Sequence, residues 1–534
     1  MERPVEPAAR RDRRSARRLT RSLRIVPALA LACCALLGGR ASAAWQPPDL
    51  RPTKTPPASV LTAYRSAAGV PDARYAQRRE RWTYVNGTRR LAVRVAVRDD
   101  DFRATIPVGD AQYAGGRSEG VRWRADANGI AHASLSDDQG DAIDRLPQSV
   151  FPFALADCAL AGKSTRFGPA WVLVDRAPRD KPHWLYVDEA SGAVTHEITR
   201  EGARTIVTSF DRFEPLGTMR RPRHWRVSDG DAADDLDVTV DAIEPQALAE
   251  LDVAIPQTRR TFAFASPPPS GAAQLPAQFR GRTIFVEVDV DGRRGWFVLD
   301  TGTASIMLDR HLAQRRGWET VLEHATVPRM SAGPLAMTGV SVFSLPLEVG
   351  YQLDGILGYD FFFGHVVHVD YEHERVEVLT PAAAQRVFAD PKNAVIPAYV
   401  DEGAPLVSAA FGAAAGERFL LDSGSPHLYV LAPFARAHPE IASWARSTFG
   451  GDREFEEADY LEGAIRVGAR TVPSFTLGPQ RFTALRVGVQ EPDDHPDALD
   501  IDLDGIVGTD QMKYFDWWFD YDGGRIAVRR NGLR

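Results

Sequence analysis

The stretch that decides the fold is GWFVLDTGT at residues 295–303, because a second version of it, GERFLLDSGS, occupies residues 416–425. In both copies an apolar run typical of a buried strand ends at an aspartate, which a hydroxyl residue and a glycine follow. A repeat of this kind indicates two copies of one structural unit. The repeat therefore predicts two related β-rich lobes in the C-terminal half of the chain.

Each copy closes with a second matching segment, which begins LDGILGYD in residues 353–378 and LDGIVGTD in residues 503–528. Aligned without gaps, these two segments are identical at ten of 26 positions and share a later Asp-Tyr pair. Chance does not produce such a match. It predicts lobes over residues 275–380 and 393–534, joined by a short helix at Pro381–Asp390.

The repeated aspartates point to acid–base chemistry. A single Asp-Thr-Gly also occurs in ordinary surface turns, but two copies in homologous lobes change that interpretation. If the lobes pack about a pseudo-twofold axis, Asp300 and Asp422 meet, and two adjacent carboxyl groups hold one proton between them. Such a pair can activate a water molecule and protonate a carbonyl oxygen. Neighbouring glycines allow close backbone approach and neighbouring hydroxyls can donate to the carboxylates; these neighbours are Gly302, Gly424, Thr303 and Ser425.

With these motifs, residues 275–534 resemble the two-lobed aspartic peptidases of the bacterial retropepsin-like and pepsin-like kind. The resemblance implies a mostly-β fold of two homologous six-stranded-type barrels, a monomer with pseudo-twofold lobes, a protein or peptide substrate, and no metal or other cofactor. It implies that Thr301 and Ser423 tie the two aspartate loops together. It also implies crossing segments beside the aspartates, formed by Ile356, Leu357, Gly358, Ile506, Val507 and Gly508.

The chain departs from the family pattern where the substrate would be covered. The flap tyrosine of the pepsin-like enzymes has no counterpart, because Tyr351, the one tyrosine between Asp300 and Gly358, lies too near the closing motif. The glycine-containing turns at Gly333 and at Gly450 and Gly451 are the alternative candidates for substrate closure.

The first block, residues 45–262, predicts a separate antiparallel-sheet domain. A helical pattern at Ser59–Arg79 precedes alternating apolar and polar runs separated by turn signals such as Asp126–Gly129. The pattern is similar to periplasmic lipoprotein-carrier-like domains, which implies a lipid or peptide ligand. A Pro-rich stretch at 263–274 is expected to be a linker.

The N-terminus predicts export. Ten Arg residues in residues 1–43, an apolar run at 25–37 and the sequence Ala41-Ser42-Ala43 are the parts of a secretory signal peptide, with cleavage near Ala43/Ala44. The run of about 13 residues is too short for an uncleaved membrane anchor, and no later stretch is apolar enough to span a bilayer. We expect a periplasmic or secreted protein with Cys158 as its one remaining cysteine.

Composition narrows the classes of function. The 534 residues are 44% apolar and 25% charged, which is typical of several globular domains and excludes a disordered, collagenous or coiled-coil chain. The net charge of −7 includes a net of +7 on residues 1–43, so the remaining 491 residues carry −14. An acidic body has no electrostatic footprint for nucleic acid.

Two other features have plain structural interpretations. A metal site among His365, His368, Asp370 and His373 is disfavoured, because the Asp-Tyr pair recurs in the other lobe without the histidines. The aromatic runs 361–363 and 517–519 are expected in the core between the lobes rather than in a binding platform.

The leading hypothesis is an exported aspartic endopeptidase with an Asp300/Asp422 pair. The alternative is a periplasmic lipid- or peptide-binding protein whose protease lobes are inactive or narrowly specific. A third arrangement, in which lobes pair between two molecules, is unnecessary because one chain holds both motifs.

Overall fold

The structure is a computed structural model. It describes residues 49–533 apart from 70–71, 88, 133–157, 176–182, 202–203, 231, 233–234, 258–259, 319, 322, 348–352, 402, 448–454, 461–462 and 491–502. Strands dominate, so the expected mostly-β fold class is confirmed. The predicted signal peptide, Gly450 and Gly451 lie outside the described residues.

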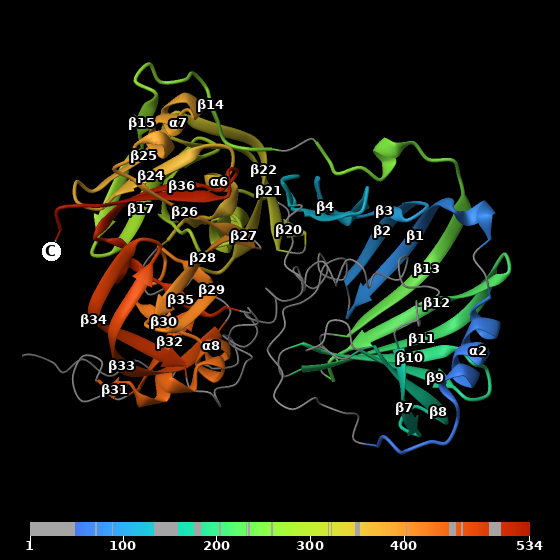
Figure 1. Cartoon of the computed structure of the whole chain (residues 1–534). Coiled ribbons are helices and arrows are strands. Elements are labelled where there is room, and N and C mark those ends of the chain that lie inside the picture. The colour runs from blue at the N-terminus through green and yellow to red at the C-terminus, as the bar shows by residue number, and fades with distance from the viewer. Residues whose placement is uncertain are drawn as a thin grey trace, which may run out of the picture.

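The first domain is built on one antiparallel sheet of thirteen strands, in the order β6-β5-β4-β3-β2-β1-β13-β12-β11-β10-β9-β8-β7. Figure 1 shows this strongly twisted sheet on the right, with α2 (Pro57–Ala68) beside the turns that join β9 to β10 and β11 to β12. The strands are β1 (Gln77–Asn86), β2 (Arg89–Arg98), β3 (Asp101–Val108), β4 (Ala111–Ser118), β5 (Val121–Ala125), β6 (Ala131–His132), β7 (Cys158–Ser164), β8 (Ala170–Asp175), β9 (His183–Asp188), β10 (Val194–Glu201), β11 (Arg204–Leu216), β12 (Met219–Ser228) and β13 (Leu236–Pro245).

The helix predicted over Ser59–Arg79 is shorter than the sequence pattern indicates. It ends at Ala68 because Gly69 takes φ +72°, where a Cβ would lie 2.1 Å from the carbonyl oxygen of Thr218. From Gln77 onward the chain is strand β1, whose buried side chains include Trp82 and Tyr84. These side chains pack in one apolar cluster with Val60 and Tyr64 of α2.

The first lobe holds a nine-stranded sheet, with the path β14-β22-β19-β23-β18-β17-β21-β20 and β16 paired to β17. Its elements are β14 (Ala263–Phe264), β16 (Ala277–Arg280), β17 (Thr283–Val290), β18 (Arg293–Leu299), β19 (Met307–Asp309), α5 (Arg310–Arg315), β20 (Thr320–Val321), β21 (His324–Ala332), β22 (Leu335–Leu345), β23 (Gly355–Leu357) and α6 (Tyr359–Phe362).

The second lobe repeats this plan, with the path β27-β28-β29-β35-β30-β34-β33-β31 and β32 paired to β33. In each lobe the strand before the aspartate is parallel to the strand of the closing motif. The elements are β27 (Tyr399–Asp401), β28 (Ala404–Phe411), β29 (Ala414–Leu421), β30 (Leu428–Val430), α8 (Ala432–Ala437), β31 (Ala445–Arg446), β32 (Phe455–Tyr460), β33 (Gly463–Leu477), β34 (Gln480–Gln490), β35 (Gly505–Val507) and α9 (Thr509–Met512).

A six-stranded sheet, β15-β25-β24-β36-β37-β26, joins the lobes. At its centre β24 of the first lobe pairs antiparallel with β36 of the second, as a pseudo-twofold axis requires. The predicted helix between the lobes is α7 (Pro381–Ala389). The strands are β15 (Ala272–Gln274), β24 (Val366–Asp370), β25 (Arg375–Leu379), β26 (Ala394–Pro397), β36 (Phe515–Asp520) and β37 (Arg525–Arg530).

The stretch expected as a linker, 263–274, contains β14 and β15, which pair with β22 and β25. Its Pro-rich centre is irregular, because proline has no N–H to donate to a neighbouring strand. The residues on either side keep their N–H groups and can therefore pair with the edge of a sheet. The chain therefore enters the first lobe before residue 275.

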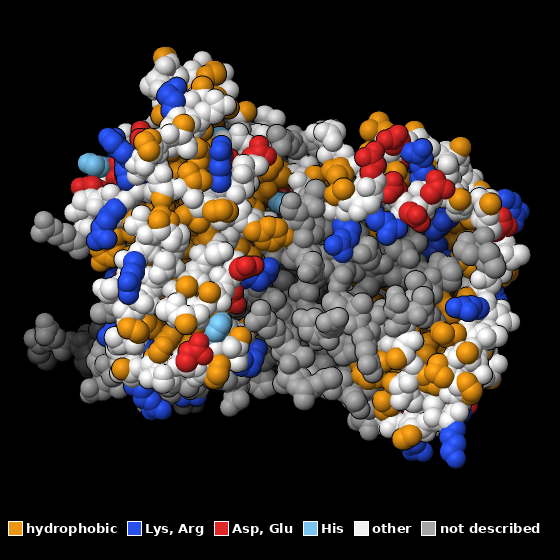
Figure 2. Space-filling model, in the orientation of Figure 1, with side chains coloured by type: hydrophobic (Ala, Val, Ile, Leu, Met, Phe, Trp, Pro, Cys, Tyr) orange, Lys and Arg blue, Asp and Glu red, His pale blue; other side chains and the backbone are white. Residues whose placement is uncertain are grey.

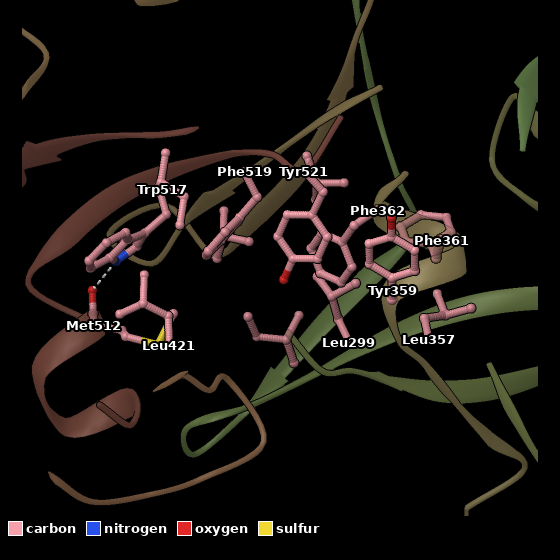
Figure 3. Packing of buried hydrophobic residues seen from close by; sticks show 14 of the residues in the cluster. Leu299, Leu357, Tyr359, Phe361, Phe362, Leu421, Met512, Trp517, Phe519 and Tyr521 are labelled. Atoms are coloured by element: carbon pink, nitrogen blue, oxygen red, sulfur yellow. Dashed lines mark hydrogen bonds between the residues drawn. The ribbon is translucent and has the colours of Figure 1, made fainter. Parts of the chain in front are cut away.

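The aromatic runs lie in the core between the lobes, as expected. Trp517 and Phe519 are buried in the apolar cluster that spans both lobes, and Phe361 and Phe362 belong to the same cluster. Figure 3 shows their rings in one row with Tyr521, and the indole of Trp517 donates to the carbonyl oxygen of Met512 at 2.7 Å.

The face of the molecule seen in Figure 2 has no large patch of side chains of one charge among the residues drawn in colour. Figure 2 shows basic side chains scattered among acidic and apolar ones rather than gathered in a stripe. Within the described part of the chain, no helix is both long enough and apolar enough to cross a bilayer.

Candidate active site

The two aspartate motifs occupy equivalent places in the two lobes. Asp300 directly follows β18, and its N–H donates to the carbonyl oxygen of Leu357 at 3.0 Å. Asp422 directly follows β29, and its N–H donates to the carbonyl oxygen of Val507, also at 3.0 Å. The repeat in sequence is therefore a repeat in position, with each aspartate held at the end of a buried strand.

Four hydrogen bonds tie the motifs to each other. The hydroxyl of Thr301 accepts from the N–H of Ser423 at 2.9 Å and donates to the carbonyl oxygen of Leu421 at 2.7 Å. The hydroxyl of Ser423 accepts from the N–H of Thr301 at 3.0 Å and donates to the carbonyl oxygen of Leu299 at 2.8 Å. We call this set the hydroxyl grip. Because Thr301 and Ser423 are buried, its bonds are shielded from water.

The glycines of the motifs place the two carboxyl groups face to face. A Cβ on Gly302 would lie 2.7 Å from the Cγ of Asp422, and a Cβ on Gly424 would lie 2.5 Å from an Oδ2 of Asp300. Each aspartate therefore packs against the glycine of the opposite motif. Any larger residue at either position would push the carboxyl groups apart.

The carboxylates receive donors from their own loops. Asp300 accepts from the N–H of Gly302 and from the hydroxyl of Thr303, both at 2.8 Å. Asp422 accepts from the N–H groups of Gly424 at 2.8 Å and Ser425 at 3.1 Å. The lobes differ here, because the expected donation from the Ser425 hydroxyl is not made: that oxygen is buried without a hydrogen-bond partner among the described residues.

The surroundings of Asp422 shift the pKa of its carboxyl group. Burial first, and then the charge of Asp300, raise the pKa of Asp422 well above the ordinary value for an aspartate, although the Gly424 and Ser425 N–H groups act in the opposite direction. The hydrogen bond between the two carboxyl groups also raises this pKa. This direction favours a shared proton on Asp422, on the side that faces Asp300.

The segments Ile356–Gly358 and Ile506–Gly508 do cross beside the pair. A Cβ on Gly358 would lie 2.3 Å from the carbonyl oxygens of Thr303 and Ser305, and a Cβ on Gly508 would lie 2.4 Å from that of His427. The glycines therefore let each crossing segment touch the loop that follows an aspartate. The structure thus brings together all the residues expected at the pair itself.

Gly333 is not brought to the pair. It occupies the turn between β21 and β22, with φ +53°, and a Cβ there would lie 2.9 Å from the side chain of Leu275. The end of this hairpin that approaches the first motif is the opposite one, where Phe343 pairs with Met307. Phe343 lies eight positions after Leu335 in β22, which is roughly 26 Å along a strand. The expectation of a closing turn at Gly333 is therefore corrected.

Two tyrosines beneath the pair were not anticipated. The hydroxyl of Tyr521 donates to the carbonyl oxygen of Thr301 at 3.0 Å. Tyr371, its counterpart in the first lobe, is buried, and burial followed by the charge of Asp422 raises the pKa of its hydroxyl. Their signal in the sequence is the Asp-Tyr pair at the same position of both repeats.

The histidines near Asp370 have separate environments. His368 stacks on Trp518 and contacts Glu377 at 3.0 Å, while His373 contacts Asp370 at 2.9 Å. Nowhere in the described ranges do three His, Cys, Asp or Glu side chains gather so as to hold a metal ion.

Comparison with known proteins gives distant likenesses. No family model matches the chain, and no curated protein matches it. An aspartic proteinase from Irpex lacteus covers 49% of this chain and 98% of its own (13% identity, TM-score 0.32). The match to a retropepsin-like aspartic protease from Rickettsia conorii covers 26% of this chain and 89% of that protein, with 14% identity and a TM-score of 0.18. The match to a LolA superfamily protein from Nitrosomonas europaea covers 37% of this chain and 96% of that protein, with 12% identity and a TM-score of 0.28. Since these TM-scores lie well below 0.5, the interpretation of the site rests on the chain's own repeat and geometry.

Proposed function

We propose that the protein is an aspartic endopeptidase that hydrolyses peptide bonds through a water molecule held between Asp300 and Asp422. The observation that carries the proposal is the hydroxyl grip, because it joins two copies of one motif so that their carboxyl groups face each other. One aspartate alone cannot act as acid and base at the same time, whereas two adjacent carboxyl groups that share a proton supply both.

The proposed reaction follows from the protonation of the pair. Asp300 removes a proton from the water, whose oxygen attacks the carbonyl carbon of the scissile peptide bond. Asp422 gives its proton to the carbonyl oxygen, which produces a tetrahedral diol. Collapse of the diol breaks the C–N bond as the proton on Asp300 passes to the leaving nitrogen, and one diol hydroxyl returns its proton to Asp422, which restores the starting pair. One water is consumed, and the products are a carboxylic acid and an amine.

The pH dependence of peptide cleavage tests this assignment. Because the pKa of Asp422 is raised, its proton is present below that pKa and is lost as the pH rises through it. We expect kcat/KM for casein-derived peptides to fall about tenfold per pH unit above the raised pKa. A statine-type inhibitor should abolish cleavage while chelators leave it unchanged. A rate that climbs between pH 5 and pH 8 would contradict the assignment.

We also propose that the protein is exported, with residues 1–43 removed as a signal peptide. Support comes from the Arg-rich head, the short apolar run and the small residues at 41–44. When the full chain is produced in a bacterial host, N-terminal sequencing of the periplasmic or secreted fraction should begin at or near Ala44. Recovery of the intact chain from the cytoplasm alone would refute export.

A further inference from the structure

A turn of the first domain is buried against the first lobe beside the candidate active site. Residues 126–129 connect β5 to β6, and Asn128 of this turn is 3% exposed. It lies against Asp360, which follows the crossing segment Ile356–Gly358 by two residues and is fully buried. The contact therefore joins the first domain to the part of the lobe that supports the Asp300 loop.

Asn128 clamps the two domains together. Its Oδ1 accepts from the N–H of Ser341 at 2.9 Å, and its Nδ2 donates to the carbonyl oxygen of Ser341 at 3.0 Å. The same Nδ2 donates to Asp360 at 3.1 Å, and the carbonyl oxygen of Asn128 accepts from the N–H of Arg260 at 2.8 Å. The side chain uses its donors and its acceptor across one interface, which indicates a built contact rather than a chance one.

Two carboxyl groups meet beside this amide. Asp126 accepts from the N–H groups of Asn128 at 2.8 Å and Ile130 at 2.9 Å. Asp360 accepts from the hydroxyl of Ser305 at 2.5 Å and from the N–H of Ile306 at 2.9 Å. Asn128 lies between the two carboxyl groups, because its N–H donates to Asp126 and its Nδ2 donates to Asp360. Two buried carboxyl groups around one amide repel each other unless one of them carries a proton.

The equivalent residue of the second lobe has a different environment. Asp510 is paired with the guanidinium of Arg282 at 2.5 Å and with His427 at 2.7 Å. Although burial opposes them, these partners lower the pKa of Asp510. The first lobe thus has a carboxyl group of another domain where the second lobe has a guanidinium and an imidazole.

We propose that Asp126, Asn128 and Asp360 form a proton-dependent latch, which holds the first domain on the first lobe while the carboxyl pair shares a proton and releases it when both ionise. The latch is a regulatory contact between domains. Its existence is independent of the proposed peptidase activity.

The histidines and tyrosines around the latch do not change protonation between about pH 4 and pH 8, so the two carboxyl groups are the ones that titrate there. Tyr113 donates to or accepts from His324 at 2.8 Å, and His132 packs on the ring of Tyr359 at 4.9 Å. Burial lowers the pKa of both histidines to about 3, so they are neutral above about pH 4. Burial raises the pKa of both tyrosines. The guanidinium groups facing this region are those of Arg124 and Arg260.

The direction of the pH effect follows from linkage. Burial and then the charge of Asp360 raise the pKa of Asp126 well above the ordinary value, and burial raises that of Asp360. A raised pKa means that the docked state binds the proton more tightly than the released state. The contribution to docking is therefore complete below the ordinary aspartate pKa and is lost as the pH rises through the raised one.

Release would also loosen the loop of the first motif. Ser305 and Ile306 are held by Asp360, and Thr303 of the same loop donates to Asp300. The latch residues are thus positioning residues for Asp300. This role in positioning rests on the proposed function, whereas the latch itself does not.

Hydrogen exchange at Ser341 tests the latch, because the partner of that N–H is Asn128 of the other domain. We expect its protection factor in the full mature chain, corrected for the intrinsic rate, to fall up to tenfold per pH unit between about pH 4 and the raised pKa. Small-angle scattering over the same pH range should show the radius of gyration rising. In Asp126→Asn, whose amide donates to Asp360 without titrating, protection should be independent of pH.

Two further variants make the outcome decisive. Asp510→Asn, at the matching position of the second lobe, should keep the wild-type pH dependence. Asn128→Ala should lose protection at every pH. Protection of Ser341 that is flat from pH 4 to pH 8 in the wild type, or an unchanged slope in Asp126→Asn, would overturn the latch. A pH-dependent latch in a chain without peptidase activity would refute the proposed function alone.

Discussion

Replacing either aspartate of the pair by asparagine is expected to reduce peptide cleavage by about 10²–10⁴-fold, because each variant removes one partner of the proton transfers. Asp300→Asn leaves no base for the water, and Asp422→Asn leaves no acid for the carbonyl oxygen. An amide occupies almost the same volume as a carboxyl group, so the loss should appear in kcat/KM and not in stability. Steady-state cleavage of a fluorogenic peptide measures it.

Asp110→Asn is the matched control for these variants. Asp110 lies in the exposed turn between β3 and β4 of the first domain, so the same chemical change there should leave kcat/KM as it is in the wild type. Unchanged turnover in Asp300→Asn or in Asp422→Asn, each with wild-type unfolding behaviour, would refute the proposed pair.

Breaking the hydroxyl grip is expected to have the second largest effect. Thr301→Val conserves shape but leaves the N–H of Ser423 and the carbonyl oxygen of Leu421 without partners in a buried site. A buried polar group without a partner costs about 1–3 kcal/mol, so the free energy of unfolding should fall by about 2–6 kcal/mol. Urea-induced unfolding followed by fluorescence measures the change.

Two comparisons make the grip prediction specific. Thr338→Val, at an exposed position of β22, should change the free energy of unfolding by less than about 0.5 kcal/mol. The double variant Thr301→Val/Ser423→Ala should be less destabilised than the sum of the single variants, because both residues belong to one network. Full additivity would show that the four bonds do not act together.

Much of the two-lobed C-terminal half could be predicted because the repeat supplied two independent examples of each feature. A duplicated strand, aspartate and glycine imply a duplicated environment, and the glycines at 302 and 424 are required by the opposite carboxyl groups. The failures lie where one copy departs from the other. Ser425 donates through its N–H rather than its hydroxyl, and Gly333 has its place at the far end of a hairpin.

Contacts between the first domain and the first lobe were beyond prediction from the sequence. Asp126 and Asn128 have the pattern of an ordinary turn, and only the packing of the first domain brings them to Asp360. The short strands β14 and β15 are equally invisible, because their pairing partners, and not their own residues, make them strands. The length of α2 depended on the single positive φ at Gly69.

A crystal structure of the mature protein with a statine-type inhibitor would show whether Asp300 and Asp422 together hold the reacting water. The inhibitor's hydroxyl group mimics the tetrahedral diol and should bind where the water is held. We predict that this hydroxyl lies within about 2.6–3.2 Å of a carboxyl oxygen of both Asp300 and Asp422. Carboxyl groups more than about 8 Å apart, too far to share a proton, or an inhibitor bound elsewhere, would contradict the account.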